Sequence, residues 1–263
     1  MKFLSKFYVG IIYFFLYIPI AVLIFFSFND SKSRVLFTGF TTKWYEKLAT
    51  NDLIINALIN TLSVALIAGV FAVILGTGAA IGINAMNKKL KGLLLNISYL
   101  PIINPDIITG ISLMLLFILL KMEMGFSTLV LAHITFNVPI VIFNVLPKLK
   151  QMDKNVYNAA LDLGCNPVQA FTKVVLPEIM PGIAAGFLLS ITYSFDDFAV
   201  SYFTSGSASQ TLSVVIYSMV KMKVSPEINA LSTIMFAFVL AVLLIVNIYG
   251  SGKKKNKKQE GEY

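Results

Sequence analysis

The sequence predicts an all-α membrane protein with six transmembrane helices. Hydrophobic residues make up 57% of the 263 residues and charged residues only 13%, and the mean hydropathy is +0.80. A soluble domain carries about 25% charged residues, so this chain has too few charges to solvate a globular surface. Lipid accepts apolar side chains when the backbone polar groups are paired internally, as they are in a helix.

Six windows have the composition of a spanning helix, which needs about 20 mostly apolar residues. The first follows Lys2 and Lys6 but is longer than the core of a signal peptide, so we expect it to remain as an anchor. Together the windows predict one transmembrane domain over residues 1–252 and a basic tail over 253–263. The spans are expected near residues 8–28, 57–86, 92–120, 125–147, 179–203 and 228–250.

The basic residues lie between the windows rather than on one face. With the N-terminus inside, fourteen of the 21 lysines and arginines fall on inner segments, five of them in residues 253–258. The positive-inside rule then predicts that both termini are cytoplasmic. The basic tail is expected to lie on the anionic leaflet of the lipid bilayer. No nucleic-acid partner is expected.

Catalytic and metal-binding motifs are missing from the sequence. The single cysteine, Cys165, excludes an internal disulfide and a cysteine metal cluster. Neither a phosphate-binding G-x-x-x-x-G-K-[ST] loop nor an H-E-x-x-H motif occurs. We therefore expect no catalytic residues, no metal and no cofactor in this chain. The only histidine, His133, has no acidic residue on its own span, which favours an interhelical hydrogen bond over a proton relay.

The third window contains two prolines and a carboxylate. Pro101 and Pro105 each remove a backbone donor, and Asp106 follows directly. Such a break persists in a membrane where protein or a water-filled cavity satisfies the freed carbonyl groups. A simple kink near one mouth of the protein is the alternative. The adjacent carboxylate favours a break that lines a pathway.

The fifth window contains two adjacent aspartates, Asp196 and Asp197, which follow an apolar helix and precede another apolar stretch. A carboxylate at the centre of a membrane helix costs about 2.5–3.5 kcal/mol on insertion scales, so the pair must face a cavity or an aqueous mouth. In one continuous helix, Ser190, Ser194, Asp197 and Ser201 would share a polar face, with Tyr193 one turn before Asp197. The alternative is that the aspartates cap a helix end, or pair with Lys221 or Lys223.

The segment between the first two windows contains the only tryptophan, Trp44, next to Tyr45. Amphipathic aromatic residues at a membrane edge usually act as interfacial anchors. We favour that role for Trp44 over contact with a substrate.

The inner loop over residues 148–178 has a pattern of its own. Val156, Ala160 and Leu163 recur at helical spacing, Gly164 can end that helix, and Pro167 suits the first turn of a second short helix. Two short amphipathic helices of this kind are typical of a docking element for another protein, or of a helix pair lying at the membrane surface.

Residues of this loop resemble a known motif. Asn158-Ala159-Ala160, Gly164 and then Leu176-Pro177 are similar to the EAA loop of binding-protein-dependent ABC transporter permeases, with Asn158 where glutamate is usual. The resemblance implies a type I ABC importer permease whose loop couples to a cytoplasmic ATPase. It implies coupling roles for the following residues: Asn158, Ala159, Ala160, Asp162, Gly164, Leu176 and Pro177.

Three further segments, at 105–117, 190–221 and 224–234, resemble spermidine/putrescine permeases of the PotC type. This resemblance implies a second homologous permease, an ATPase dimer that uses ATP and magnesium, and an extracellular polyamine-binding protein. Localisation in a bacterial cytoplasmic membrane is also implied. Carboxylates would offset the charge of a polyamine and aromatic rings would accept its ammonium groups and methylenes. The substrate-pathway candidates are Asp197, Asp196, Asp106, Tyr193, Ser194, Trp44 and Tyr202.

Other functions stay open at this point. A permease for ferric iron, an anion or an organophosphonate would have the same topology, although the paired aspartates favour a cation. A secondary transporter would have no need of a helix–glycine–helix coupling loop. A membrane assembly factor without transport activity would leave the aspartates without a role.

Overall fold

The computed structural model of the chain describes residues 2–31, 36–222, 226–237 and 240. Across these residues the regular structure is helical, apart from an isolated bridge between Asn29 and Phe40. The described residues divide into two compact units, one within Met1–Ile55 and Ile216–Tyr263 and the other within Asn56–Val215.

The first unit pairs a long apolar helix with a short polar segment. Trp44 is buried, and its indole Nε1 donates to the carbonyl oxygen of Asn29 at 2.7 Å. Lys47 forms an ion pair with Glu227. The helices of this unit are α1 (Lys2–Ser27), α2 (Lys43–Ala49), the first turn of α3 (Asp52–Ala85), most of α11 (Leu212–Met222) and a helix over 226–237.

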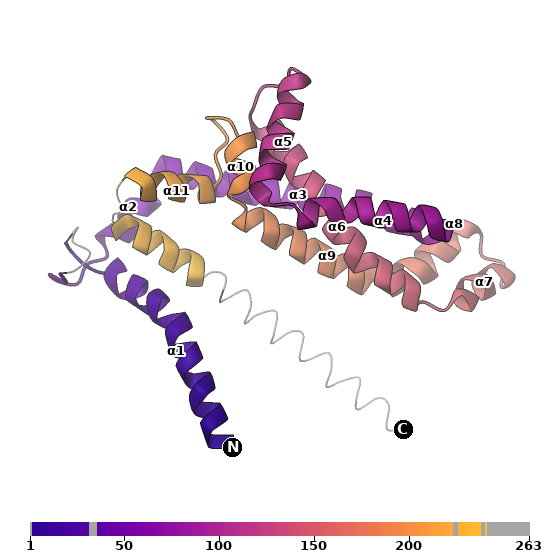
Figure 1. Cartoon of the computed structure of the whole chain (residues 1–263), viewed down its shortest axis with the longest axis horizontal. Coiled ribbons are helices and arrows are strands. Elements are labelled where there is room, and N and C mark those ends of the chain that lie inside the picture. Colours follow the sequence, from indigo (N-terminus) through magenta and orange to yellow (C-terminus); the bar gives the residue numbers. More distant parts are fainter. Residues whose placement is uncertain (1, 32–35, 223–225, 238–239, 241–263) are drawn as a thin grey trace. The chain divides into compact units, whose positions relative to one another are not determined.

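The second unit is organised around one helix, α6, against which α4, α5, α9 and α10 pack. Figure 1 shows α6 and α9 running side by side. The elements after α3 are α4 (Lys88–Ile103), α5 (Asp106–Leu119), α6 (Phe126–Gln151), α7 (Lys154–Asp162), α8 (Pro167–Ala170), the π-helix η1 (Phe171–Val175), α9 (Leu176–Asp196) and α10 (Ala199–Thr204).

Two apolar clusters hold this unit together. The larger joins α3, α6, η1 and α9 around Val141, Val145 and Ile179, all fully buried. The smaller joins α5, α6 and α10 through Leu113, Ala132 and Val200. Close packing of such side chains gives each helix a fixed orientation. The second cluster therefore fixes α5 and α10 beside each other on α6.

Among the described residues, four helices are long and apolar enough to cross a membrane, and α4 with α5 would make a fifth if the bent pair counts as one span. About half of the expected sixth span near 228–250 lies outside the described residues. Two expected spans are interrupted. The span near 92–120 consists of α4 and α5, bent by 105°, and the span near 179–203 ends at Asp196 before α10 begins at Ala199.

The inner loop also differs from its expected form. Its first short helix is present as α7, but its second is not separate, because α8 continues through η1 into α9. The junction is π-helical, and such turns inside longer helices are frequent at functional sites. The helical segment therefore runs without a loop from Pro167 to Asp196.

Candidate functional site

The first helix break in the second unit is built by proline. Asn104 and Pro105 both have extended backbone conformations, with ψ of 141° and 134°. A residue before proline is disfavoured in the helical region, so α4 ends here. Asp106 is the first residue of α5, where the helix dipole favours a carboxylate. The local sequence alone therefore places a negative charge at the bend.

The second break is built by a side chain. Asp197 is extended, with ψ of 123°, and no proline or glycine follows it before α10. Its Oδ1 accepts from the backbone N–H of Val200 at 3.2 Å, and its Oδ2 accepts from that of Ser201 at 2.7 Å. These bonds satisfy donors that the start of a helix leaves free. Asp197 therefore caps α10, which is the role that the capping alternative predicted for the pair of aspartates.

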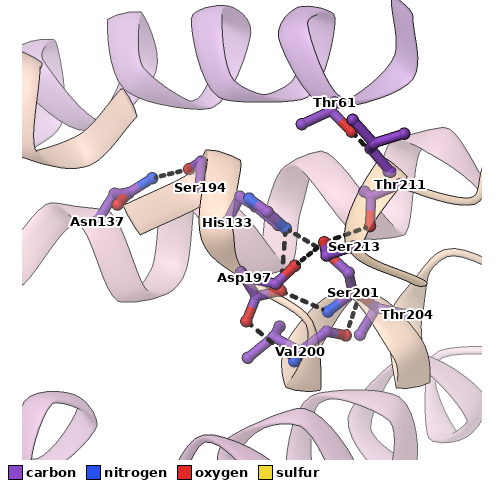
Figure 2. Close-up of polar contacts among 11 residues, drawn as sticks. Thr61, His133, Asn137, Ser194, Asp197, Val200, Ser201, Thr204, Thr211 and Ser213 are labelled. Carbon is purple, nitrogen blue, oxygen red and sulfur yellow. Dashed lines mark hydrogen bonds and ion pairs between the residues drawn. The ribbon is translucent and has the colours of Figure 1, made fainter. Parts of the chain in front are cut away.

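A buried polar network surrounds Asp197 (Figure 2). His133 of α6 is fully buried, and its Nε2 lies 3.1 Å from Ser201 Oγ and 3.6 Å from Asp197 Oδ2. Ser213 of α11 donates its hydroxyl to the carbonyl oxygen of Asp197 at 2.6 Å. The expected interhelical hydrogen bond of His133 is confirmed. It joins α6 to α10.

Further bonds tie this region to α3 and α6. The hydroxyl of Thr61 in α3 accepts from the N–H of Leu212 at 2.8 Å (Figure 2). Thr128 of α6 donates to the carbonyl oxygen of Thr204 at 2.8 Å. Both bonds involve fully or almost fully buried threonines, and buried polar groups left without partners are costly. The segment after the second break is therefore anchored on two sides.

A cavity of about 460 Å³ lies where the two breaks meet. Three carboxylates line it, those of Asp106, Asp196 and Asp197. The rest of its wall is aromatic or aliphatic apart from one threonine, and none of the described residues that line it is basic. The other lining residues are Pro101, Ile102, Thr109, Phe136, Ile140, Tyr193, Phe198, Ala199 and Val200.

The two adjacent aspartates differ in their surroundings. The side chain of Asp197 is only 9% exposed, and both of its oxygens accept backbone hydrogen bonds. Asp196 is exposed and receives no hydrogen bond from the described residues. The helix ends at Asp196 and Asp197 is extended, so the two neighbouring side chains do not continue one helical face. One is consequently part of the interior while the other borders open space.

The remaining pathway candidates do not line the cavity. Ser194 is buried and accepts from Asn137 Nδ2 at 2.7 Å (Figure 2). Tyr202 is exposed on α10, with its ring 5.5 Å from that of Phe198. Trp44 belongs to the first unit. The polar face expected from Ser190 to Ser201 is interrupted, because the helix ends at Asp196.

Several residues of the cavity wall were not among the predicted pathway residues, and three of them show what the sequence could and could not indicate. Thr109 lies one turn after Asp106 on the same helix, so helical spacing could have found it. Phe198 directly follows Asp197 in the sequence. Phe136 comes from α6, and no pattern in the sequence connects that helix to either break.

Lys221 and Lys223 were the alternative partners proposed for the aspartates. Lys223 lies outside the described residues, and Lys221 belongs to the first unit. Within the described part of the chain, no group of three or more histidine, cysteine, aspartate or glutamate side chains could hold a metal ion.

The inner loop ends its first helix with a left-handed glycine. Gly164 has φ of +89°, and its N–H donates to Leu161 while that of Cys165 donates to Ala160. These two bonds form the motif that typically closes a helix with glycine. Of the coupling candidates, Asn158, Ala159, Asp162 and Pro177 are exposed, Leu176 is half-buried, and Ala160 is buried against the loop.

Comparisons with known proteins identify the fold and the family of this chain. A crystal structure of a bacterial ABC transporter involved in the import of the acidic polysaccharide alginate has the same fold, with a TM-score of 0.77 at 16% identity over 94% of this chain and 95% of that chain. Residues 72–250 match the family described as binding-protein-dependent transport system inner membrane component. The fold and the family match define a permease of an ABC importer.

Two curated relatives are similar over most of the chain. The spermidine/putrescine transport system permease protein PotC of Escherichia coli (strain K12) is 39% identical over 93% of this chain and 92% of that protein. The putrescine transport system permease protein PotI of the same strain is 38% identical over 86% of this chain and 83% of its own length. The chain therefore belongs to the binding-protein-dependent transport system inner membrane components, in the group of PotC-like permeases.

Proposed function

We propose that this chain is the permease subunit that carries polyamines, spermidine or putrescine, across the cytoplasmic membrane. The observation that supports this most directly is the cavity with three carboxylates and no basic residue among its described lining residues. A polyamine joins ammonium groups through methylenes, so it needs negative charge and apolar surface within one site. The similarity to PotC and PotI gives the same substrate class.

Asp106 lies at one helix break and the pair Asp196–Asp197 at the other, so carboxylates from the two breaks can receive different ammonium groups of one molecule. The rings of Tyr193 and Phe136 would lie against the methylenes or an ammonium group, because aromatic faces attract cations. With so few charges, binding stays weak enough for release, as transport requires. An anion such as an organophosphonate would meet three repelling carboxylates.

Transport would depend on partners that bind both ends of this subunit. The family is defined by dependence on a binding protein, which would deliver the polyamine from outside. A second homologous permease would supply the other wall of the pathway. An ATPase dimer, which holds ATP and magnesium, would bind the inner loop. With this arrangement, both chain termini would lie in the cytoplasm.

The exposed side chains of the inner loop fit such a docking role. Leu163 and Val168 are 86% and 71% exposed and lie on either side of Gly164. Isolated apolar side chains on a protruding loop are suited to the groove of a protein partner. Because α8 continues through η1 into α9, movement of the loop would reach Asp196 along one helical segment. The cavity would then open alternately to the two sides.

The test is uptake of radiolabelled spermidine and putrescine by proteoliposomes that contain the whole importer. We expect uptake that depends on ATP, and we expect Asp196→Asn to raise KM about tenfold or more because a charge-assisted contact is lost. Glu123→Gln, an exposed carboxylate outside the cavity wall, is the matched control and should match the parent.

Three outcomes would argue against the proposal. If the importer carries neither amine, the substrate class is wrong, and ferric iron or another small solute takes its place. Uptake driven by an ion gradient without ATP would indicate a secondary transporter. If Asp196→Asn transports like Glu123→Gln, the cavity loses its role in cation binding.

A further inference from the structure

We propose that Asp197 is a positioning residue held in place by His133 and Ser201, and that Asp196 alone of the adjacent pair contacts the transported cation. This inference rests on the proposed polyamine function of the cavity. It assigns different roles to two carboxylates that are neighbours in sequence and that both border the same cavity.

The hydrogen-bonding capacity of Asp197 is directed into the protein. Each of its oxygens accepts a backbone N–H of α10, from Val200 and from Ser201. His133 Nε2 lies 3.6 Å from Oδ2 on the side facing α6. A cation that took over these oxygens would leave two backbone donors at the start of α10 without partners. Buried donors without partners are costly, so the cap competes against direct binding.

Asp196 has the opposite character. It is exposed, it lines the cavity, and no described residue donates to it. A carboxylate in this state keeps its lone pairs for a ligand, and its negative charge is not offset by a neighbouring base in the described part of the cavity wall. The ammonium group of a polyamine would therefore find its strongest available acceptor at Asp196.

His133 fixes where the second break lies. It is fully buried, and its Nε2 is directed at Ser201 Oγ, 3.1 Å away, and at Asp197. Its Nδ1 has no hydrogen-bond partner among the described residues. The polar contacts of this side chain thus run from α6 to the first turn of α10 (Figure 2). Because Phe198, Ala199 and Val200 of that turn line the cavity, His133 positions one wall of the site without touching the cavity itself.

The experiment distinguishes a helix-capping role of Asp197 from a role that needs its negative charge. Asparagine carries no charge but caps helices well through its single acceptor oxygen, so it can keep one of the two backbone bonds, whereas alanine keeps neither. We expect Asp197→Asn to keep KM for spermidine within about threefold of the parent, and Asp197→Ala to lower uptake about tenfold or more. In the same assay Asp196→Asn should raise KM about tenfold or more, and Asp196→Ala should raise it by a similar factor.

His133 is tested by the same logic. Glutamine retains a side-chain amide that can bond to Ser201, so His133→Gln should retain more uptake than His133→Leu. Rescue by the polar variant distinguishes a hydrogen-bonded positioning role from simple filling of space. Equal uptake by the two variants would overturn this part of the proposal.

Two results would overturn the inference on the aspartates. One is that Asp197→Asn fails as badly as Asp197→Ala, which would make the charge itself essential. The other is that Asp196→Asn transports normally. The amount of assembled importer and its melting temperature are measured for every variant. If Asp197→Ala does not assemble, the comparison of Asp197→Asn with the parent and with Asp196→Asn still decides whether the charge of Asp197 is needed.

The assay also separates this inference from the proposed function. An intact importer that moves no polyamine would contradict the function. The melting temperatures of the purified complexes would then still test the cap, which requires Asp197→Asn to lie close to the parent and Asp197→Ala to lie about 2–4 °C lower or more.

Discussion

The two helix breaks that border the cavity are made in different ways. Between α4 and α5, Pro105 forces the preceding Asn104 into an extended conformation, and the chain bends by 105°. Between α9 and α10 no proline or glycine is present, and the side chain of Asp197 holds the turn through two backbone N–H groups. The first break is therefore imposed by the local restriction of a proline, whereas the second depends on hydrogen bonds of a side chain.

This difference predicts a difference in tolerance. A proline-imposed bend persists when its surroundings change, because the restriction is local. The bend at Asp197 depends on His133 of α6, Ser213 of α11 and the threonines that anchor the segment behind it. A side chain held by distant partners can be released when those partners move. The second break is therefore the part of the cavity that we expect to change during transport.

The largest effect is expected where the two breaks meet. Gly110 of α5 faces α10 so closely that a Cβ would lie 3.1 Å from the carbonyl oxygen of Ala199 and 2.9 Å from the ring of Phe203. Gly110→Val should destabilise the subunit by about 2–3 kcal/mol, because overpacking against backbone cannot be relieved by a side chain turning away. Thermal unfolding of the purified importer measures this.

Gly78→Val is the matched control for this prediction, because no heavy atom lies within 4 Å of a Cβ at Gly78. Equal stability of the two variants would show that α5 and α10 do not depend on each other. The contrast between the two breaks would then have to be explained without this contact.

A smaller effect is expected at the third interruption of the helices, in the inner loop. Gly164 has φ of +89°, which costs a side chain about 1–2 kcal/mol. Gly164→Ala should therefore strain the turn and lower ATP hydrolysis stimulated by the loaded binding protein. Gly164→Asn should retain more of that stimulation, since asparagine adopts this conformation readily. If alanine is tolerated fully, the turn has no role in coupling.

The smallest effect is expected at Pro105. Pro105→Ala should lower stability by only about 0.5–1 kcal/mol, chiefly by giving the unfolded chain more freedom. The bend should relax towards a continuous helix, because alanine lifts the restriction on Asn104, while Leu113 and Phe117 keep α5 in its own cluster. Crosslinking between cysteines placed on α4 and α5 would report the angle. A bend that kept its parent angle in this variant would mean that packing, rather than proline, makes the bend.

Much of the fold could be predicted along the chain. The membrane class follows from the low charge and long apolar windows, the bend at residues 101–106 from two prolines, and the turn at Gly164 from helix periodicity ending at a glycine. Each of these features is determined within about one helical window, so composition and spacing carry the information. Of the six expected spans, the described residues contain four helices of spanning length and composition, or five if α4 and α5 count as one span, and about half of the last window lies outside them.

The candidate site could be predicted only in part. Asp106, Tyr193, Asp196 and Asp197 were singled out as unusual residues and do line one cavity, although their role in transport stays a prediction. Ser194 and Trp44 were also predicted as pathway residues because they are polar or aromatic, but both are buried and neither is part of the cavity wall. Residue type identified candidates without showing which way each side chain points.

The sequence by itself determined the class of protein, the proline bend and the helix–glycine turn of the inner loop, because the covalent restrictions behind them act between near neighbours. Tertiary structure decided that the fifth window breaks after Asp196, and that Asp197 turns inward while Asp196 faces the cavity. The partners that decide this, His133 and Ser213, lie far from Asp197 along the chain or beyond another break. The helical periodicity of the fifth window cannot predict this break, because the competing hydrogen bonds form only when α6, α10 and α11 come together.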